Sequence, residues 1–164
     1  MRAPFKAFLF PRFTMAYVIR LMVVILTATV VFGFVLMPFF IRGHSMAPTY
    51  RDGGLNFCNR LRFVFTPPQR QDVVAIRLAG QSIVLLKRVV ALEGDVVEFR
   101  NGHLHVNHRP VDEPYVHNPF AWNLPPRKVK SGNVYVVGDN RRVPMDRHHF
   151  GQTARERIIG GPLW

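Results

Sequence analysis

The hydrophobic pattern begins with an uncharged run of 21 residues at 21–41, LMVVILTATVVFGFVLMPFFI. As a helix rising about 1.5 Å per residue, this run spans about 31 Å, close to the hydrocarbon core of a bilayer. It is too long for a buried helix in so small a domain. It also lacks the shorter apolar core and the A-x-A-like cleavage site of a signal peptide. The pattern therefore predicts a transmembrane helix at 21–41.

The residues before this run are basic. Within 1–20 the charged side chains are Arg2, Lys6, Arg12 and Arg20, and none is acidic. Basic flanks are typical of the cytoplasmic side of a membrane segment. We therefore expect residues 1–20 in the cytoplasm and residues 42–164 on the non-cytoplasmic face.

Beyond residue 51 the pattern changes to short apolar runs separated by turn residues. These runs are rich in Val, Ile and Leu and predict strands at 55–58, 73–77, 83–92, 96–100, 103–106 and 134–137. Asn101-Gly102 separates two of them and is a strong signal for a two-residue hairpin. The segments 66–68, 119–126 and 131–133 are expected to be loops. The predicted fold is mainly β: a transmembrane helix followed by one compact, antiparallel β domain.

Composition narrows the possible partners. The 164 residues carry a net charge of +12, and the pI is near 11.2, which favours a polyanionic neighbour. The basic residues are spread along the chain and are not interleaved with aromatic residues, so we expect anionic lipid headgroups and no nucleic acid. Cys58 is the only cysteine, and His103 and His105 have no third ligand nearby, so neither a metal nor a cofactor is expected.

The stretch 41–49, IRGHSMAPT, contains the candidate nucleophile, Ser45. Gly43 allows close approach of a ligand to the backbone, and Pro48 favours an extended or turn geometry before it. One interpretation is a simple turn after the apolar segment. The other is a nucleophilic serine at the membrane surface, which requires a base.

Lys87 is the candidate base. The chain has four lysines, of which Lys6 is expected on the cytoplasmic side, while Lys128 and Lys130 lie in a polar loop. Only Lys87 interrupts an apolar strand, where burial lowers the pKa of a lysine towards the value that a general base needs. Arginine stays protonated and cannot replace it. The alternative is a structural lysine on an edge strand with its amine in solvent.

A Ser-His-Asp triad is a second way to activate Ser45. His44 adjoins Ser45 and would point away from it in an extended chain. His148 or His149, with Asp146, would have to reach Ser45 through the fold. A Ser-Lys pair follows the same logic of nucleophile and base.

With these residues in view, the chain resembles the type I signal peptidases, which are membrane-anchored serine proteases with a Ser-Lys dyad. Four segments resemble the boxes of that family, in family order: 43–49 (GHSMAPT), 71–74 (QDVV), 86–95 (LKRVVALEGD) and 136–141 (VVGDNR). Asp146 and the pair Phe150-Gly151 extend the last match. Together they cover about 42–151, nearly all of the expected β domain.

The resemblance implies roles for individual residues. Ser45 would attack the scissile carbonyl, and Lys87 would take its proton and later activate water to release an acyl-enzyme. The Ser45 N–H, with the Gly43 region, would hold the oxyanion. Asp139, Asn140, Arg141 and Asp146 would support the site. The peptide would lie as an added strand between two segments, formed by Ile41, Arg42, His44 and Met46 on one side and by Ile83, Val84 and Leu85 on the other.

Three positions depart from the family pattern. Gly43 stands where some members carry a hydroxyl, and His148 stands where an arginine often pairs with the aspartate. Pro144 replaces a serine that helps to orient the lysine in many members. We therefore expect a backbone carbonyl or an ordered water near 138–142 to orient Lys87, with Asp146 bracing the loop.

The function implied is removal of signal peptides from exported preproteins at the cell membrane. The short interval between Lys87 and Gly138 leaves little room for a large accessory domain, which also fits the mitochondrial inner-membrane peptidases. Two alternatives are a Ser-Lys protease dedicated to a narrow secretion or conjugation substrate and a membrane-tethered nucleic-acid binder.

Overall fold

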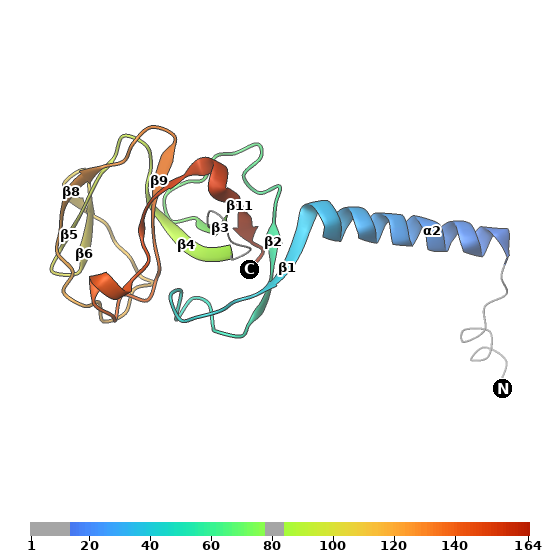
Figure 1. The fold of residues 1–164 in the computed structure, drawn as a ribbon, viewed down its shortest axis with the longest axis horizontal. Helices are drawn as coiled ribbons and strands as arrows, with labels where there is room; N and C mark the ends of the chain where they lie inside the picture. The colour runs from blue at the N-terminus through green and yellow to red at the C-terminus, as the bar shows by residue number, and fades with distance from the viewer. Residues whose placement is uncertain (1–13, 78–83) are drawn as a thin grey trace.

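The computed structural model describes residues 14–77 and 84–164. A single helix projects from a β body, and Figure 1 shows β1 and β2 next to that helix and β5, β6 and β8 at the far end. The helix comprises α2 (Met15–Val30) and a π-helical turn, Val31–Val35. Its first turn is capped by the Thr14 side chain, which accepts a hydrogen bond from the Tyr17 N–H at 3.3 Å.

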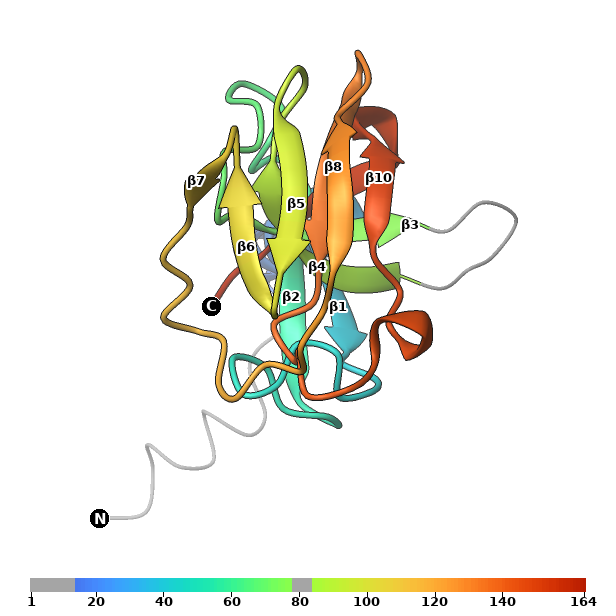
Figure 2. The same ribbon diagram turned by 90° about the vertical axis from the view of Figure 1, so that its left-hand side faces the viewer.

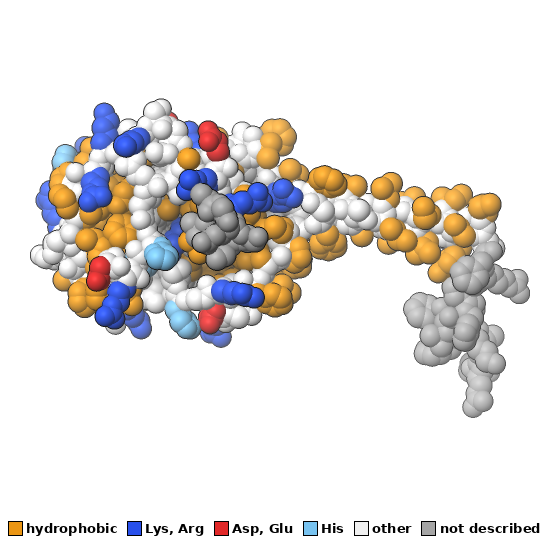
Figure 3. Space-filling model, viewed as in Figure 1, with side chains coloured by type: hydrophobic (Ala, Val, Ile, Leu, Met, Phe, Trp, Pro, Cys, Tyr) orange, Lys and Arg blue, Asp and Glu red, His pale blue; other side chains and the backbone are white. Residues whose placement is uncertain are grey.

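The helix is apolar along its length except for Arg20 in its second turn. Met15–Val35 is 21 residues long, and by length and composition it is the one helix in the described ranges able to cross a membrane. Figure 3 shows hydrophobic side chains along its whole visible length, whereas Lys and Arg side chains are spread over the β body. A helix that is hydrophobic all round needs an apolar surrounding.

The bounds of this helix correct the prediction of 21–41. The helix begins six residues earlier, so that Arg20 lies within it, and it ends at Val35. Residues Leu36–Phe40 instead form β1, which pairs antiparallel with β2 (Leu55–Asn59). The absence of charge does not distinguish an apolar helix from an apolar strand, and the pairing with β2 decides the difference. Pro38 is tolerated because β1 is an edge strand.

Seven strands form the main sheet, in the order β1-β2-β11-β3-β4-β9-β10. All pairings are antiparallel. The remaining strands of this sheet are β3 (Val73–Arg77), β4 (Val84–Ala91), β9 (Asn133–Val137), β10 (Gly151–Ala154) and β11 (Ile158–Pro162). The mainly antiparallel β fold predicted from the sequence is confirmed.

A second sheet of four strands has the order β7-β6-β5-β8, and Figure 2 shows it face-on. Its strands are β5 (Val96–Arg100), β6 (His103–Val106), β7 (Arg109–Pro110) and β8 (Leu124–Lys128). The predicted hairpin is confirmed, because Asn101 and Gly102, with φ of 48° and 85°, connect β5 to β6. β8 lies partly in the segment predicted as a loop. It contains Pro125 and Pro126, which an edge strand accepts.

The helix is attached to the body at two points. The Arg60 guanidinium donates to the Gly33 carbonyl at 3.1 Å. Phe57 packs between Phe32 of the helical segment and Trp164, with ring centroids 6.2 and 5.7 Å apart. These contacts join the end of the helix to β2 and to the last residue of the chain.

Candidate active site

Ser45 lies in the turn-rich loop between β1 and β2. Gly43 adopts φ +87°, a conformation that favours glycine, and its N–H donates to Asp52 Oδ1 at 2.7 Å. Met46 is 2% exposed and anchors the loop in a core cluster with Ile41 and Leu86. Within the described residues, neither the N–H nor the hydroxyl of Ser45 has a hydrogen-bond partner. Both groups are therefore available to a substrate.

The segment after β9 holds the Ser45 loop in place. The Asn140 N–H donates to the Ser45 carbonyl at 3.0 Å, and its side-chain amide donates to the His44 carbonyl at 2.9 Å. The carboxylate of Asp139 accepts from the Thr49 hydroxyl at 2.5 Å. Asp139 and Asn140, two of the residues predicted to support the site, thus bond to the loop before, at and after Ser45.

Gly138 lies where these two segments come closest. A Cβ at this position would overlap the carbonyl oxygen of Ser45 and would lie 2.9 Å from Nε2 of His148. The Gly138 N–H donates to the same Nε2 at 3.1 Å. Only glycine fits at this position, because there is no space for a Cβ. The motif 136–141 includes this glycine, but the sequence does not show that packing is the reason for it.

Lys87 is buried in β4. Its side chain is on the same face as Leu85 and Val89 and is paired in register with Val74 of β3. It is 3% exposed, and this burial lowers the pKa of Lys87 to about 8, against a smaller raising effect of the Asp139 charge. Half of the amine is therefore neutral near pH 8, well below the ordinary lysine value of 10.5, and the burial agrees with the expectation from its apolar strand.

The structure places Ser45 and Lys87 on either side of Gly138 and His148. His148 contacts Gly138 and lies close enough to Lys87 for the lysine charge to lower the pKa of His148. Ser45 and Lys87 line separate hollows, which share Leu85. Among the residues that the structure describes, the side-chain amine of Lys87 makes no hydrogen bond. Catalytic hydrogen bonds often tighten only when a substrate binds.

His148 is a structural acceptor in this fold. It is 8% exposed, packs on Trp122 with ring centroids 4.9 Å apart, and accepts the Gly138 N–H. Burial, followed by the charges of Lys87 and Arg141, lowers the pKa of His148 to about 3. The ring is neutral at physiological pH, and its Nε2 is already occupied, so His148 does not fit the role of base for Ser45.

The expected role of Asp146 is wrong. Asp146 is exposed and, in the described part of the chain, makes no hydrogen bond or ion pair. It therefore neither pairs with His148 or His149 in a triad nor braces the loop after β9. The buried imidazole of His148, which accepts from the Gly138 N–H, holds that loop instead.

Among the residues that the structure describes, no carbonyl of segment 138–142 accepts a hydrogen bond from the Lys87 amine, so the expected orienting carbonyl is not found there. The Gly138 carbonyl accepts from Arg141 Nε at 2.8 Å, and the Arg141 carbonyl accepts from the Phe120 N–H at 2.7 Å. Packing in β4 thus determines the direction of the Lys87 stem. Its amine lines a hollow of about 130 Å³ together with Val136.

Two buried ion pairs lie next to the site, and they were not predicted from the sequence. Arg88 donates from Nε and Nη2 to the Asp139 carboxylate at 2.8 and 2.6 Å and lies 3.9 Å above the Tyr115 ring. Arg141 donates to Glu113 at 2.7 Å, and the Tyr115 hydroxyl donates to the same carboxylate at 2.9 Å. Burial raises the pKa of Tyr115, so this hydroxyl stays a donor. The segment before β8 carries Glu113 and Tyr115, and no motif in it signals this role.

A groove leads to Ser45 between β1 and the start of β4. Both edges have unpaired backbone there, because β1 is an edge strand and β4 pairs with β9 only from Arg88 onwards. The hollows that form the groove are lined on the β1 side by Met37, Pro38, Phe39, Phe40, Ile41, Arg42, Gly43, Ser45 and Met46, and on the β4 side by Val84, Leu85 and Leu86. An extended peptide fits between two such edges.

The predicted substrate residues divide into three groups. Arg42, Val84 and Leu85 line the groove, as expected. Ile41 and Met46 also border it but are buried in the core, and both backbone groups of Ile41 bond to the loop at Gly53 and Gly54. The His44 side chain is exposed, lies 3.9 Å from Asp52, and does not line the groove, contrary to the prediction. Ile83 lies outside the described residues.

No group of three or more His, Cys, Asp or Glu side chains in the described ranges is arranged to hold a metal ion. Cys58 is buried at 0% exposure in the core cluster that contains Met46. The polar groups that bond to the loop around Ser45 include the amides of Asn140 and the carboxylates of Asp52 and Asp139.

Replacing Gly138 with alanine should destabilise this site. The added methyl would have to displace the Ser45 carbonyl or His148, at a cost of about 1–3 kcal/mol in the free energy of unfolding. Urea unfolding in detergent, followed by tryptophan fluorescence, measures the change. Gly33→Ala is the matched control, since a Cβ there meets nothing within 4 Å. Equal stability of Gly138→Ala and the parent protein would contradict the close packing described here.

Comparison with known proteins places this arrangement in a family. Residues 14–162 match the family described as "Signal peptidase, peptidase S26". The probable signal peptidase I-1 of Synechocystis sp. is 34% identical over 152 residues, which cover 88% of this chain and 78% of the relative. Signal peptidase I of Bacillus caldolyticus is 32% identical over 142 residues, covering 77% of each chain.

A solved structure is also similar. The crystal structure of a signal peptidase I from Enterococcus faecalis V583 matches with a TM-score of 0.47 and 24% identity, covering 58% of this chain and 97% of that one. The family match over nearly the whole chain and the identity to full signal peptidases are the decisive findings. The chain belongs to the signal peptidase family, peptidase S26, and is a serine endopeptidase that removes signal peptides.

Proposed function

We propose that Ser45 is the nucleophile of this signal peptidase and that Lys87 is its general base. The observation that carries the proposal is the burial of Lys87, whose pKa falls to about 8. The Lys87 charge lowers the pKa of His148, which accepts from Gly138, and Gly138 is in close contact with the Ser45 carbonyl. The amine makes no hydrogen bond among the described residues, and its four-carbon stem is flexible. It turns towards the Ser45 hydroxyl when a peptide closes the groove.

In this mechanism Lys87 accepts the proton of Ser45 as the hydroxyl attacks the scissile carbonyl. The Ser45 N–H, which has no protein acceptor in the described part, donates to the developing oxyanion. Protonated Lys87 then passes its proton to the leaving amine, and an ester with Ser45 remains. Water, deprotonated by Lys87, hydrolyses that ester and restores the hydroxyl.

The signal-peptide end of the substrate lies extended in the groove between β1 and β4. Its backbone bonds to the open edges of both strands, and its small side chains face the apolar walls formed by Phe39, Val84 and Leu85. Ile41 and Met46 form the floor and fix the depth of the groove.

Substitution of the two proposed catalytic residues tests the assignment. Ser45→Ala and Lys87→Met should each abolish cleavage of a model preprotein, because a nucleophile and its base act as a unit. N-terminal sequencing of the product identifies the cleaved bond. Lys130→Met, at an exposed lysine, should keep the parent rate. Cleavage within severalfold of the parent by either site variant would sink the Ser-Lys assignment.

The pH dependence of kcat/KM should report Lys87. Only the neutral amine accepts a proton, so activity should rise with pH through a midpoint near 8, the lowered pKa of Lys87, and then level off. Below the midpoint, the rate should fall about tenfold for each pH unit. His148, whose pKa is about 3, should contribute no step between about pH 5 and pH 10. A midpoint near the ordinary lysine value of 10.5 would show that Lys87 is not desolvated in the free enzyme.

We further propose that Met15–Val35 crosses the membrane and that the β body rests on anionic headgroups on its non-cytoplasmic side. The helix carries only one charged side chain, Arg20 near its start, and Arg60, Phe57 and Trp164 fix its other end against the body. The basic residues before it favour a cytoplasmic N-terminus. The membrane is the cytoplasmic membrane; the mitochondrial inner membrane is the alternative.

Cysteine labelling tests this orientation. Cys58 is fully buried, so the parent chain should react slowly with a membrane-impermeant maleimide. In sealed right-side-out vesicles, Gln69→Cys, at an exposed position, should be labelled directly. Ala3→Cys should be labelled only after permeabilisation. The opposite pattern would reverse the proposed topology.

A further inference from the structure

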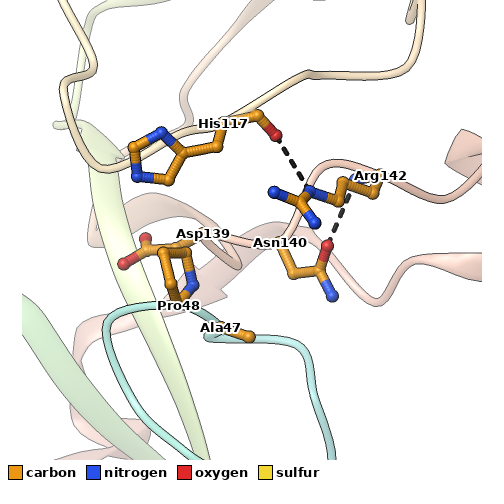
Figure 4. Close-up of a pocket in the computed structure, with 6 residues that line it drawn as sticks. All are labelled: Ala47, Pro48, His117, Asp139, Asn140 and Arg142. Carbon is orange, nitrogen blue, oxygen red and sulfur yellow. Dashed lines mark hydrogen bonds between the residues drawn. The ribbon is translucent and has the colours of Figure 1, made fainter.

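A second hollow lies on the far side of Ser45 from the groove. It has a volume of about 100 Å³ and is lined by Ala47, Pro48, His117, Asp139, Asn140 and Arg142. Figure 4 shows Ala47 and Pro48 on one side of it and the side chains of His117 and Arg142 on the other. A hollow of this volume has room for a small side chain.

The hollow contains one uncompensated charge. Both oxygens of Asp139 are taken, by the Arg88 guanidinium and the Thr49 hydroxyl, so this carboxylate is neutralised within the protein. Arg142 donates from Nε to the His117 carbonyl at 3.3 Å, and its backbone N–H donates to Asn140 Oδ1 at 3.2 Å. In the part of the chain that the structure describes, Arg142 has no carboxylate partner.

The hollow lies beyond the groove along the path that an extended peptide substrate would follow past Ser45. Residues up to Met46 line the groove, whereas Ala47 and Pro48, which follow the nucleophile, line the hollow. Asn140 connects the two regions, since it donates to the Ser45 carbonyl beside the groove and also lines the hollow. A peptide whose scissile carbonyl is at Ser45 leaves the groove and continues past Asn140.

We propose that this hollow is a subsite for an acidic side chain near the new N-terminus of the mature protein, with Arg142 as the residue that selects it. The inference rests on the proposed role of Ser45. The Arg142 guanidinium is held through Nε by the His117 carbonyl, and its backbone N–H is held by Asn140, so the terminal nitrogens remain available as the fork that a carboxylate matches. Because the site is open to solvent, its contribution is a modest preference, which salt weakens.

The test compares preproteins that differ in one residue after the cleavage site. Glutamine at the first, second or third mature position is replaced by glutamate, one position at a time, and kcat/KM is measured for each pair. At one of these positions the parent enzyme should favour glutamate over glutamine about two- to fivefold at low salt. High salt should reduce this ratio towards one.

Two enzyme variants assign the preference. Arg142→Gln should remove it, and Arg142→Glu should reverse it in favour of a lysine substrate. Arg147→Gln removes the same charge from an exposed neighbour that does not line the hollow, and it should keep the ratio of the parent enzyme. A ratio unchanged by Arg142→Gln, or lowered equally by Arg147→Gln, would overturn the subsite.

Ser45→Ala separates this inference from the proposal it depends on. If Ser45→Ala is inactive on the glutamine substrates and the ratio does not respond to Arg142, only the subsite fails. If Ser45→Ala still cleaves these substrates, the assigned nucleophile fails, and the subsite fails with it.

Discussion

The catalytic arrangement depends on one close backbone contact, in which the carbonyl of Ser45 lies against the α-carbon of Gly138. No side chain fits between them, and Asn140 bonds the same carbonyl at 3.0 Å. This contact fixes the Ser45 loop to the end of β9, which pairs with β4, the strand that carries Lys87. The relative position of Ser45 and Lys87, the proposed nucleophile and base, is thus set by backbone packing between segments more than 90 residues apart, as the contact between Ser45 and Asn140 illustrates.

The electrostatics around this contact follow from burial. Lys87 is surrounded by apolar side chains of β3 and β4, and desolvation lowers its pKa to about 8. An arginine in the position of His148 would place a permanent positive charge nearby, whereas a neutral imidazole accepts the Gly138 N–H and packs on Trp122. The charged groups Arg88 and Asp139 pair with each other on the other side of the strand. The desolvated amine of Lys87 and the ion pair that helps to hold the loops therefore lie on opposite sides of the strand.

Much of this architecture could be predicted from the sequence. Apolar runs located the central strands, Asn101-Gly102 located the hairpin, and the apolar run around Lys87 indicated that this lysine is buried. The chain could not show where the apolar segment changes from helix to β1, because Leu36–Phe40 is defined by pairing with β2 rather than by composition. Glycine- and proline-rich strands such as β8 and β11 were missed for the same reason.

The side-chain partners were harder to predict than the elements. Asp146 carries a charge in a matching motif, yet the fold leaves it exposed, while the partners of Arg141 and Arg88 come from a segment with no recognisable pattern. His44 adjoins Ser45 in sequence, but its side chain turns towards Asp52. Long-range packing decides such contacts, and single-sequence periodicity does not encode it.

Direct titration of Lys87 tests the central claim most closely. The chain has only four lysines, so selective isotope labelling of lysine side chains gives a simple NMR spectrum, in which Lys87→Met identifies one signal. The account predicts that this signal titrates with a pKa of about 8 in the free, full-length enzyme. A Lys87 signal that titrates near the ordinary lysine value of 10.5 would contradict it.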